Sequence, residues 1–84
     1  MKYKIGDKVR VRQWEAMVRQ YELLSNGNIG IYKEYLYPFL KTNKKFCGQI
    51  VTIKKIENDC YRIKEDNERC CWIDEMFEGC AFQF

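Results

Sequence analysis

The most regular pattern of apolar residues lies at residues 50–56, where β-branched Ile, Val and Thr side chains predominate and lysines suit an exposed face. Because β-branched residues favour extended backbone, this stretch is predicted to be a strand. Residues 57–59, Glu-Asn-Asp, accept turn geometry. A three-residue turn there predicts a hairpin in which Ile53 lies opposite Ile63.

A second turn, predicted at Asp66 and Asn67, would extend this hairpin into a third strand. Because successive side chains of a strand point to opposite faces, the resulting ribbon has one apolar and one polar face. The predicted cross-strand pairs are Lys55 with Tyr61, Ile63 with Cys70, and Tyr61 with Trp72. The apolar face holds Tyr61, Ile63, Cys70 and Trp72, and the polar face holds Arg62, Lys64, Arg69 and Cys71. A shift by one residue would bury Arg62 and Lys64, which disfavours that register.

The period of the apolar residues changes near the amino terminus. Residues 8–12 alternate between charged residues and valine, which predicts a strand with one buried face. From residue 14 onward, apolar side chains recur at intervals of three and four, which is typical of an amphipathic helix. These side chains are Trp14, Met17, Val18, Tyr21 and Leu24. We predict a helix over residues 14–24 that packs its apolar face on the sheet and ends at residues 25–27, Ser-Asn-Gly.

Residues 28–45 are rich in tyrosine and contain the single proline of the chain, Pro38. Two interpretations compete for this segment. Pro38 suits the first turn of a helix that runs to about Lys44, because its missing N–H would have no partner there in any case. Alternatively, the segment is an irregular loop over the end of a small barrel, with Leu36 and Phe39 buried. We favour the short helix.

The length of 84 residues fits one domain that spans residues 1–84. A chain of this size buries about 60–65% of its surface on folding, which leaves little room for a deep catalytic cavity. No apolar run is long enough to cross a bilayer, and the first residues lack the apolar stretch of a secretory signal. The sequence therefore predicts a cytoplasmic protein that does not bind membranes.

Five cysteines and the absence of histidine limit the chemistry that this chain offers. The cysteines are Cys47, Cys60, Cys70, Cys71 and Cys80. Their number is odd, and adjacent Cys70 and Cys71 point to opposite faces of a strand, so we expect free thiols, with Cys47 and Cys70 as small buried side chains. Structural zinc sites use closely spaced Cys or His pairs, so no metal and no cofactor are expected.

Catalysis is not expected either. Without histidine, a Cys-His or Ser-His pair is impossible. Adjacent acids at residues 65–66 and 74–75 are the remaining candidates for acid–base chemistry, but turns at protein surfaces commonly carry such pairs. We therefore expect solvated turn residues at both places and a protein that is not an enzyme.

The charge of the chain differs between its two parts. Residues 1–56 contain 12 Lys and Arg and 4 Asp and Glu, whereas residues 57–84 contain 3 and 8, within a total of +3. The basic residues that cluster around the Pro38 segment and the predicted strand are Lys41, Lys44, Lys45, Lys54 and Lys55. Aromatic side chains lie between them in the sequence, and basic residues among aromatics can hold a nucleic-acid backbone and stack on bases. Pairing with the acidic hairpin or ordinary solubility would also explain the charges.

Four stretches of the sequence together carry a resemblance to known proteins. They are Gly6-Asp7-Lys8-Val9-Arg10-Val11-Arg12, Phe46-Cys47-Gly48-Gln49-Ile50-Val51-Thr52-Ile53, Tyr61-Arg62-Ile63 and Trp72-Ile73-Asp74-Glu75-Met76-Phe77. In this order they resemble short SH3-like barrel proteins encoded by bacteria and their prophages. The resemblance implies a mainly β fold, a small SH3-like five-stranded barrel with a short helical insertion after the first strand and a helical turn at residues 74–77. It implies no functional residues.

Two functions are consistent with these features. The first is a protein-binding module that takes an extended peptide or a partner surface on an aromatic groove, with Trp14, Tyr21, Tyr35 and Tyr37 as candidate contacts. Trp72 is a further candidate, although its predicted inward direction favours a place in the core. For a prophage-type protein, the partner would be a host enzyme or defence complex that the small protein blocks. The alternative is a nucleic-acid-binding accessory domain in which the five clustered lysines contact phosphates.

Overall fold

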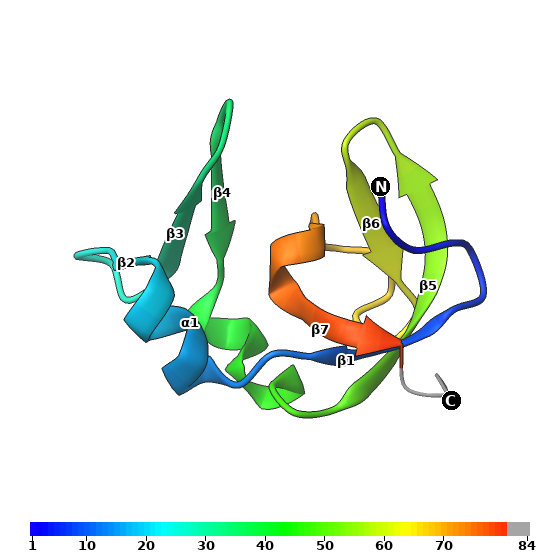
Figure 1. Cartoon of the computed structure of the whole chain (residues 1–84), viewed down its shortest axis with the longest axis horizontal. Helices are drawn as coiled ribbons and strands as arrows, with labels where there is room; N and C mark the ends of the chain where they lie inside the picture. Colours follow the sequence, from blue (N-terminus) through cyan, green and yellow to red (C-terminus); the bar gives the residue numbers. More distant parts are fainter. Residues whose placement is uncertain (81–84) are drawn as a thin grey trace.

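The strands of the protein form two antiparallel sheets in a computed structural model that describes residues 1–80 (Figure 1). The larger sheet has the order β6-β5-β1-β7 and comprises β1 (Lys8–Val11), β5 (Ile50–Glu57), β6 (Cys60–Ile63) and β7 (Phe77–Cys80). The smaller sheet has the order β2-β3-β4 and comprises β2 (Glu22–Leu23), β3 (Ile29–Tyr32) and β4 (Leu36–Phe39). The helical elements are α1 (Trp14–Gln20) and the 3₁₀ helices η1 (Lys41–Phe46) and η2 (Asp74–Met76).

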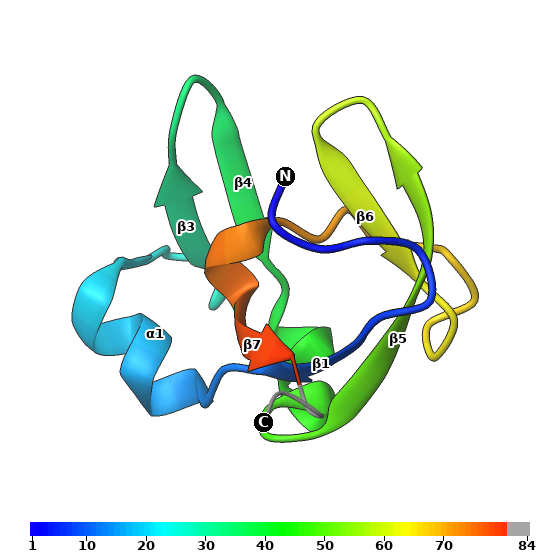
Figure 2. The ribbon, with the colours of Figure 1, turned by 45° about the vertical axis from the view of Figure 1, so that its right-hand side comes forward.

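The mainly β class is confirmed, whereas the five-stranded SH3-like barrel is not. Within residues 1–80 the strands form two separate sheets and do not close into one barrel. The helix after the first strand and the helical turn before the last strand both lie where the resemblance implied them. The β3–β4 and β5–β6 hairpins stand on opposite sides of the segment that carries η2 (Figures 1 and 2).

Strand β1 confirms the amino-terminal alternation of charged and apolar residues. Val9 and Val11 are fully buried, while Lys8 and Arg10 are exposed. The strand lies between β5 and β7, and Val9 is opposite Val51 on one side and Cys80 on the other. Because successive side chains of a strand point to opposite faces, alternating valines place one buried face on β1, as the sequence predicts.

The helix after β1 is shorter than the predicted range of residues 14–24. It ends at Gln20, and Tyr21 already has extended backbone, with φ −120° and ψ 176°. The chain then pairs with β3 in the short strand β2, so the backbone groups that would have continued the helix bond to another strand. Gly27, with φ +90°, forms the turn between β2 and β3 and not the end of a helix.

A hairpin, and neither a helix nor an irregular loop, occupies the tyrosine-rich segment. Strands β3 and β4 pair with Gly30 opposite Pro38. The Lys33 N–H donates to the Tyr35 carbonyl at 2.9 Å. Hydrogen-bonded and non-hydrogen-bonded pairs alternate along the hairpin from this point, so the backbone nitrogen of Pro38, which has no hydrogen to donate, faces the free edge of β4. A proline is therefore tolerated in this edge strand, and the helical turn η1 begins later, at Lys41.

The β5–β6 hairpin confirms part of the predicted register. Ile53 lies opposite Ile63 as expected, but Lys55 lies opposite Arg62 and not Tyr61. The turn contains two residues instead of three, with φ +49° at Asn58, and a bulge between Ile53 and Lys55 compensates for the difference. A bulge adds one residue to one strand, so the two register changes cancel at Ile53.

The predicted third strand of the ribbon is reduced to a single bridge between Tyr61 and Trp72. Ile63 does not pair with Cys70, because Asn67 and Glu68 adopt left-handed backbone and turn the chain away. Burial nevertheless follows the prediction. On the apolar face Tyr61, Ile63 and Trp72 are buried and Cys70 is half-buried, whereas the side chains assigned to the polar face are exposed or half-buried.

Trp72 lies at the centre of the core that joins the two sheets. It is fully buried, and its ring contacts Phe39 of β4 at 5.6 Å, Phe46 of η1 at 5.9 Å and Phe77 of β7 at 5.7 Å between centroids. The core assignment of Trp72 is therefore confirmed. All five cysteines are free, but Cys60 is the buried one and Cys47 and Cys70 are only half-buried.

The hydroxyl of Tyr61 fastens the amino-terminal segment to η2. It accepts the Tyr3 N–H at 3.0 Å and donates to the Asp74 carboxylate, which also accepts the Lys2 N–H at 3.3 Å. Burial, together with the hydrogen bond to Asp74, raises the pKa of Tyr61 from 10.0 to about 12. The folded chain therefore holds this proton more tightly than the unfolded chain does.

We expect Tyr61→Phe to lower the free energy of unfolding by about 1–3 kcal/mol at pH 7, because the buried Tyr3 N–H loses its acceptor. In the parent protein the stabilisation linked to the Tyr61 proton is complete below about pH 10 and is lost as the pH rises towards about 12. Urea unfolding between pH 7 and 11 should therefore show a smaller decline above pH 10 in the variant. Equal declines in the two proteins would contradict this assignment.

Candidate functional site

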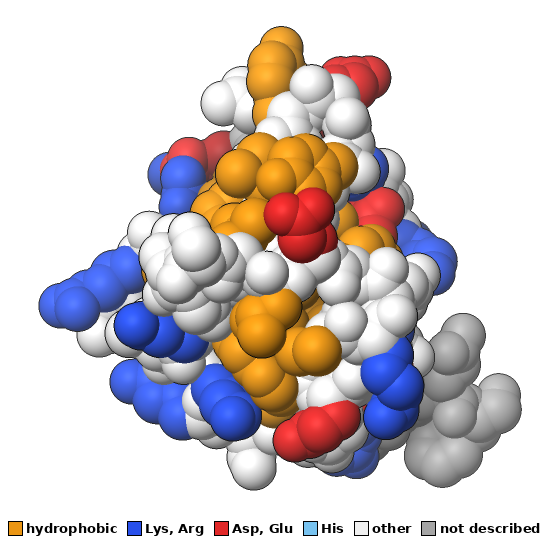
Figure 3. All heavy atoms as spheres, turned by 90° about the vertical axis from the view of Figure 1, so that its left-hand side faces the viewer, with side chains coloured by type: hydrophobic (Ala, Val, Ile, Leu, Met, Phe, Trp, Pro, Cys, Tyr) orange, Lys and Arg blue, Asp and Glu red, His pale blue; other side chains and the backbone are white. Residues whose placement is uncertain are grey.

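Large hydrophobic side chains are exposed together on the β3–β4 hairpin. Tyr32 is 60% exposed, Tyr35 69% and Leu36 44%. Tyr32 lies opposite Leu36, and exposed Pro38 follows on the same face of β4. Together with Tyr35 of the adjoining loop, these residues are the exposed apolar side chains of the hairpin, and we call the four of them the hairpin patch. Figure 3 shows hydrophobic side chains gathered on the side of the molecule that carries α1 and the three-stranded sheet, with single acidic side chains among them.

Gly30 allows leucine side chains to cover this face of the sheet. A Cβ at Gly30 would lie 3.0 Å from Leu24 and 3.1 Å from Leu36, so the leucines rest directly on the backbone of β3. The opposite face of the hairpin carries Ile29, Ile31 and Phe39, all of which are buried in the core. One face of the three-stranded sheet therefore stabilises the fold, and the other presents apolar side chains to solvent.

The structure separates the four predicted aromatic contacts. Tyr35 is exposed at the hairpin loop and belongs to the hairpin patch. Trp14 and Tyr21 are half-buried side chains packed against the core, with the Trp14 ring 5.9 Å from Phe39. Tyr37 points to the other side of the hairpin from Leu36 and lines a groove. Tyr32 and Leu36 were missed by sequence reasoning, although the alternation in Ile-Gly-Ile-Tyr and Leu-Tyr-Pro-Phe is a signal for paired strands.

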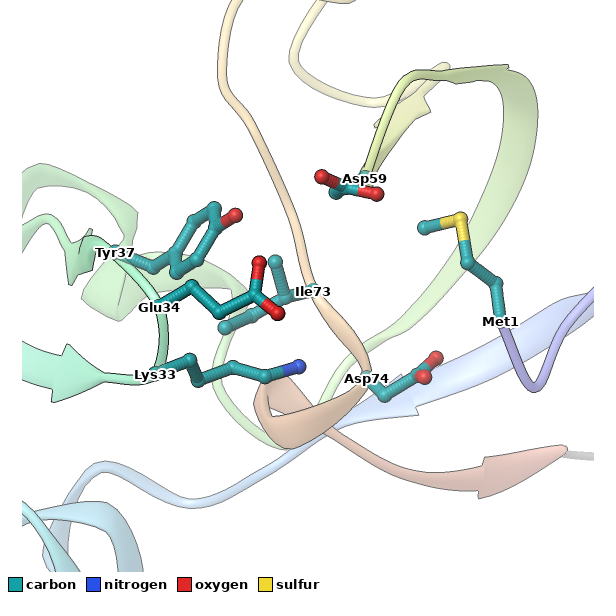
Figure 4. Close-up of a pocket in the computed structure, with 7 residues that line it drawn as sticks. All are labelled: Met1, Lys33, Glu34, Tyr37, Asp59, Ile73 and Asp74. Carbon is teal, nitrogen blue, oxygen red and sulfur yellow. The ribbon is translucent and has the colours of Figure 1, made fainter.

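A groove lies between the tips of the two hairpins. Its larger part has a volume of about 240 Å³ and is bounded by Lys33, Glu34 and Tyr37 of the β3–β4 hairpin, Asp59 of the β5–β6 turn, Met1, Ile73 and Asp74 (Figure 4). A second hollow of about 190 Å³, which includes Arg62 and Cys71, shares Tyr37 and Asp59 with the first. Partial burial raises the pKa of Tyr37, and the nearby Asp59 adds to that rise. The two hollows thus adjoin at Tyr37 and Asp59.

Several acidic side chains have structural partners. Asp74 accepts hydrogen bonds from Tyr61 and Lys2, and Glu65 accepts both the backbone N–H and the hydroxyl of Thr52, at 2.8 and 3.0 Å. Lys33 lies 3.2 Å from the Glu75 carboxylate, whose hydrogen bond raises the pKa of the lysine. Both acid pairs lie in a turn or in η2 with exposed or half-buried side chains, and Glu65, Asp74 and Glu75 in addition hold loops in place.

The structure divides the five predicted lysines into two groups. Lys41, Lys44 and Lys45 are exposed on η1, where the Lys44 ammonium lies 5.2 Å from the centre of the Trp14 ring and that of Lys45 5.3 Å from the Phe46 ring. Lys54 and Lys55 lie farther along the chain on β5, which begins at Ile50, after the end of η1. At about 3.3 Å per strand residue they are roughly 13–17 Å from that first residue of the strand. Lys55 also pairs with Glu57 at 2.9 Å. The five lysines therefore do not form one basic surface.

Comparisons of this chain with protein-family models, curated proteins and solved structures found no match. The resemblance to short SH3-like barrel proteins stays a prediction. Among residues 1–80, no helix has the length and apolar character that crossing a membrane requires.

Proposed function

We propose that this chain is a non-catalytic protein-binding module that contacts its partner through the hairpin patch. The exposure of Tyr32, Tyr35 and Leu36 on one hairpin is the observation that carries this proposal. Contiguous apolar side chains on a protein surface mark interaction sites, and tyrosine is enriched in protein interfaces. The two strands of the hairpin hold these side chains in fixed positions, which lowers the entropy cost of binding.

The prophage-type resemblance adds a proposal about the partner. If the four-stranded sheet and η2 derive from an SH3-like barrel, the β2–β4 sheet is an addition that such a barrel does not need for its own closure. An added sheet with an exposed apolar face fits a phage-type modulator that binds and blocks a host protein. Blocking needs a complementary surface and no catalytic group, in keeping with a chain that lacks histidine.

The test is affinity capture from the native host with matched variants. We expect Tyr35→Ser/Leu36→Ser to capture at least about tenfold less of a specific partner than the parent chain, because losing two central apolar contacts costs 1.4 kcal/mol or more. Ile5→Ser is the control, since Ile5 is 64% exposed outside the hairpin. Circular dichroism should show unchanged folding in both variants. Equal capture by the double variant and the Ile5→Ser control would contradict the proposal.

A nucleic-acid-binding role is the second candidate, and the exposed lysines of η1 favour it. Lys41, Lys44 and Lys45 have no ion pair among residues 1–80, and the Lys44 ammonium lies 5.2 Å from the centre of the Trp14 ring of α1. Binding of single- and double-stranded oligonucleotides at 50 and 200 mM salt tests this role. Appreciable affinity that falls steeply with salt and is lost in Lys44→Gln/Lys45→Gln would support it, and negligible binding at both concentrations would exclude it.

A further inference from the structure

We infer that the groove between the two hairpins receives an arginine side chain of the partner protein. This inference rests on the proposed protein-binding function, because it assigns the chemistry of the partner next to the hairpin patch. The groove and the patch share one hairpin: Tyr37 turns into the groove, while Leu36 and Pro38 belong to the patch. A segment that lies across the hairpin tip would therefore reach both.

The size of the groove favours single side chains as occupants. Its two hollows measure about 240 and 190 Å³. Each hollow alone is smaller than the space of about 300–1,000 Å³ that usually surrounds a drug-sized molecule, and exposed Asp59 on their shared wall leaves both open to solvent. Two smaller hollows that meet at Tyr37 and Asp59 instead suit an extended peptide that places one side chain in the larger hollow and continues over the second.

The charge of the larger hollow favours a cation. The carboxylates of Glu34 and Asp59 turn toward the same space from opposite hairpins (Figure 4). Neither has a hydrogen bond or an ion pair from its side chain to another of residues 1–80, whereas the lysine of the hollow, Lys33, is already paired with Glu75. The side-chain charge that is left to face the groove is therefore negative.

The arrangement of these acids favours arginine over lysine. A guanidinium group is planar and has five N–H donors, so it can bond to carboxylates on two walls at once, whereas an ammonium group acts as a point charge. The ring of Tyr37 borders the same space, and a guanidinium also packs well on an aromatic face. Apolar Met1 and Ile73 complete the walls and suit the methylene groups of an arginine side chain.

The test compares two peptides that differ in a single charge. N-acetyl-Ala-Arg-Ala-amide and its citrulline analogue have nearly the same shape, but citrulline is neutral. In titrations followed by amide NMR shifts of the full chain, we expect the arginine peptide to shift residues around the groove in a saturable manner, with at least about tenfold higher affinity than the citrulline peptide. Free L-arginine should bind more weakly than the peptide, because its own carboxylate faces the same acids. Tighter binding of the free amino acid would assign the groove to a small molecule and overturn the inference.

Variants locate the binding. Glu34→Gln/Asp59→Asn should lower the affinity for the arginine peptide at least about tenfold, whereas Glu15→Gln/Glu22→Gln, which removes two exposed acids elsewhere, should leave it within about twofold. Equal affinity for the two peptides in the parent protein would overturn the inference without any variant. Shifts spread over the whole surface, or loss caused equally by both double variants, would overturn it as well.

The two proposals can fail separately. If partner capture depends on Tyr35 and Leu36 but the arginine peptide does not bind the groove, the protein-binding function stands and the arginine inference falls. If the arginine peptide binds the groove but partner capture does not depend on the hairpin patch, the proposed function falls, and with it the assignment of the arginine to the partner.

Discussion

Trp72→Ala is expected to lower the free energy of unfolding by about 3–5 kcal/mol, which is the usual cost of removing a large buried aromatic side chain. A domain of this size has about 5–15 kcal/mol in total, so the variant should be close to unfolding at room temperature. The reason is the position of Trp72, whose ring contacts Phe39 of one sheet and Phe77 of the other. Its loss removes the packing that holds the two sheets together.

Urea unfolding followed by far-ultraviolet circular dichroism measures this effect. Tyr35→Ala is the matched control, because Tyr35 is aromatic but 69% exposed, and its loss should change stability by no more than about 0.5 kcal/mol. If Trp72→Ala does not fold, Trp72→Phe keeps part of the aromatic packing and should still unfold at a lower urea concentration than the parent protein. A loss below about 1 kcal/mol for Trp72→Ala would contradict the central role of this residue.

Asp66→Ala is expected to destabilise the protein by about 3 kcal/mol, because one carboxylate supports the whole loop between β6 and Trp72. Its oxygens accept the Trp72 Nε1–H at 2.9 Å, the Cys70 N–H at 3.2 Å and the Arg69 N–H at 3.3 Å. The indole N–H would be left without an acceptor inside the core, and hydrogen bonds to charged groups contribute more than neutral ones.

The same urea measurement tests this loop. Asp66→Asn keeps one acceptor oxygen and should cost less than Asp66→Ala. Glu22→Ala removes an exposed acid from β2 and should change stability by no more than about 0.5 kcal/mol. Equal stabilities of Asp66→Ala and Glu22→Ala would show that the loop does not depend on the carboxylate.

The sequence predicted the elements whose pattern is set by burial on one face. Val9 and Val11 in β1, and Ile53 opposite Ile63 in the β5–β6 hairpin, follow from alternation alone, since a slip would bury charged side chains. The end of α1 could not be predicted in this way. Residues 22 and 23 pair with β3, and that tertiary contact outweighs the local helical period.

In the β3–β4 hairpin the signal of alternation is weakened by Pro38, and the groove has no signal in the local pattern at all. A proline usually indicates a break in a helix or strand, and Pro38 is acceptable in β4 only because that strand lies at the edge of its sheet. Glu34 and Asp59 face the same groove because the tips of two separate hairpins border it, and their spacing in the sequence gives no sign of it. Tyr35, one of the candidate contacts, is exposed, whereas two of the five clustered lysines lie on β5 and three on η1.

The position of the Pro38 nitrogen at the free edge of β4 also bears on whether two copies of this chain can pair edge to edge. An edge strand that bears tyrosine and leucine side chains is a template on which identical molecules could stack into fibrils. The proline interrupts the row of donors along that border, so an incoming strand cannot complete its ladder there. The exposed apolar side chains of the hairpin patch therefore lie beside an edge that is poorly suited to pairing with a second copy.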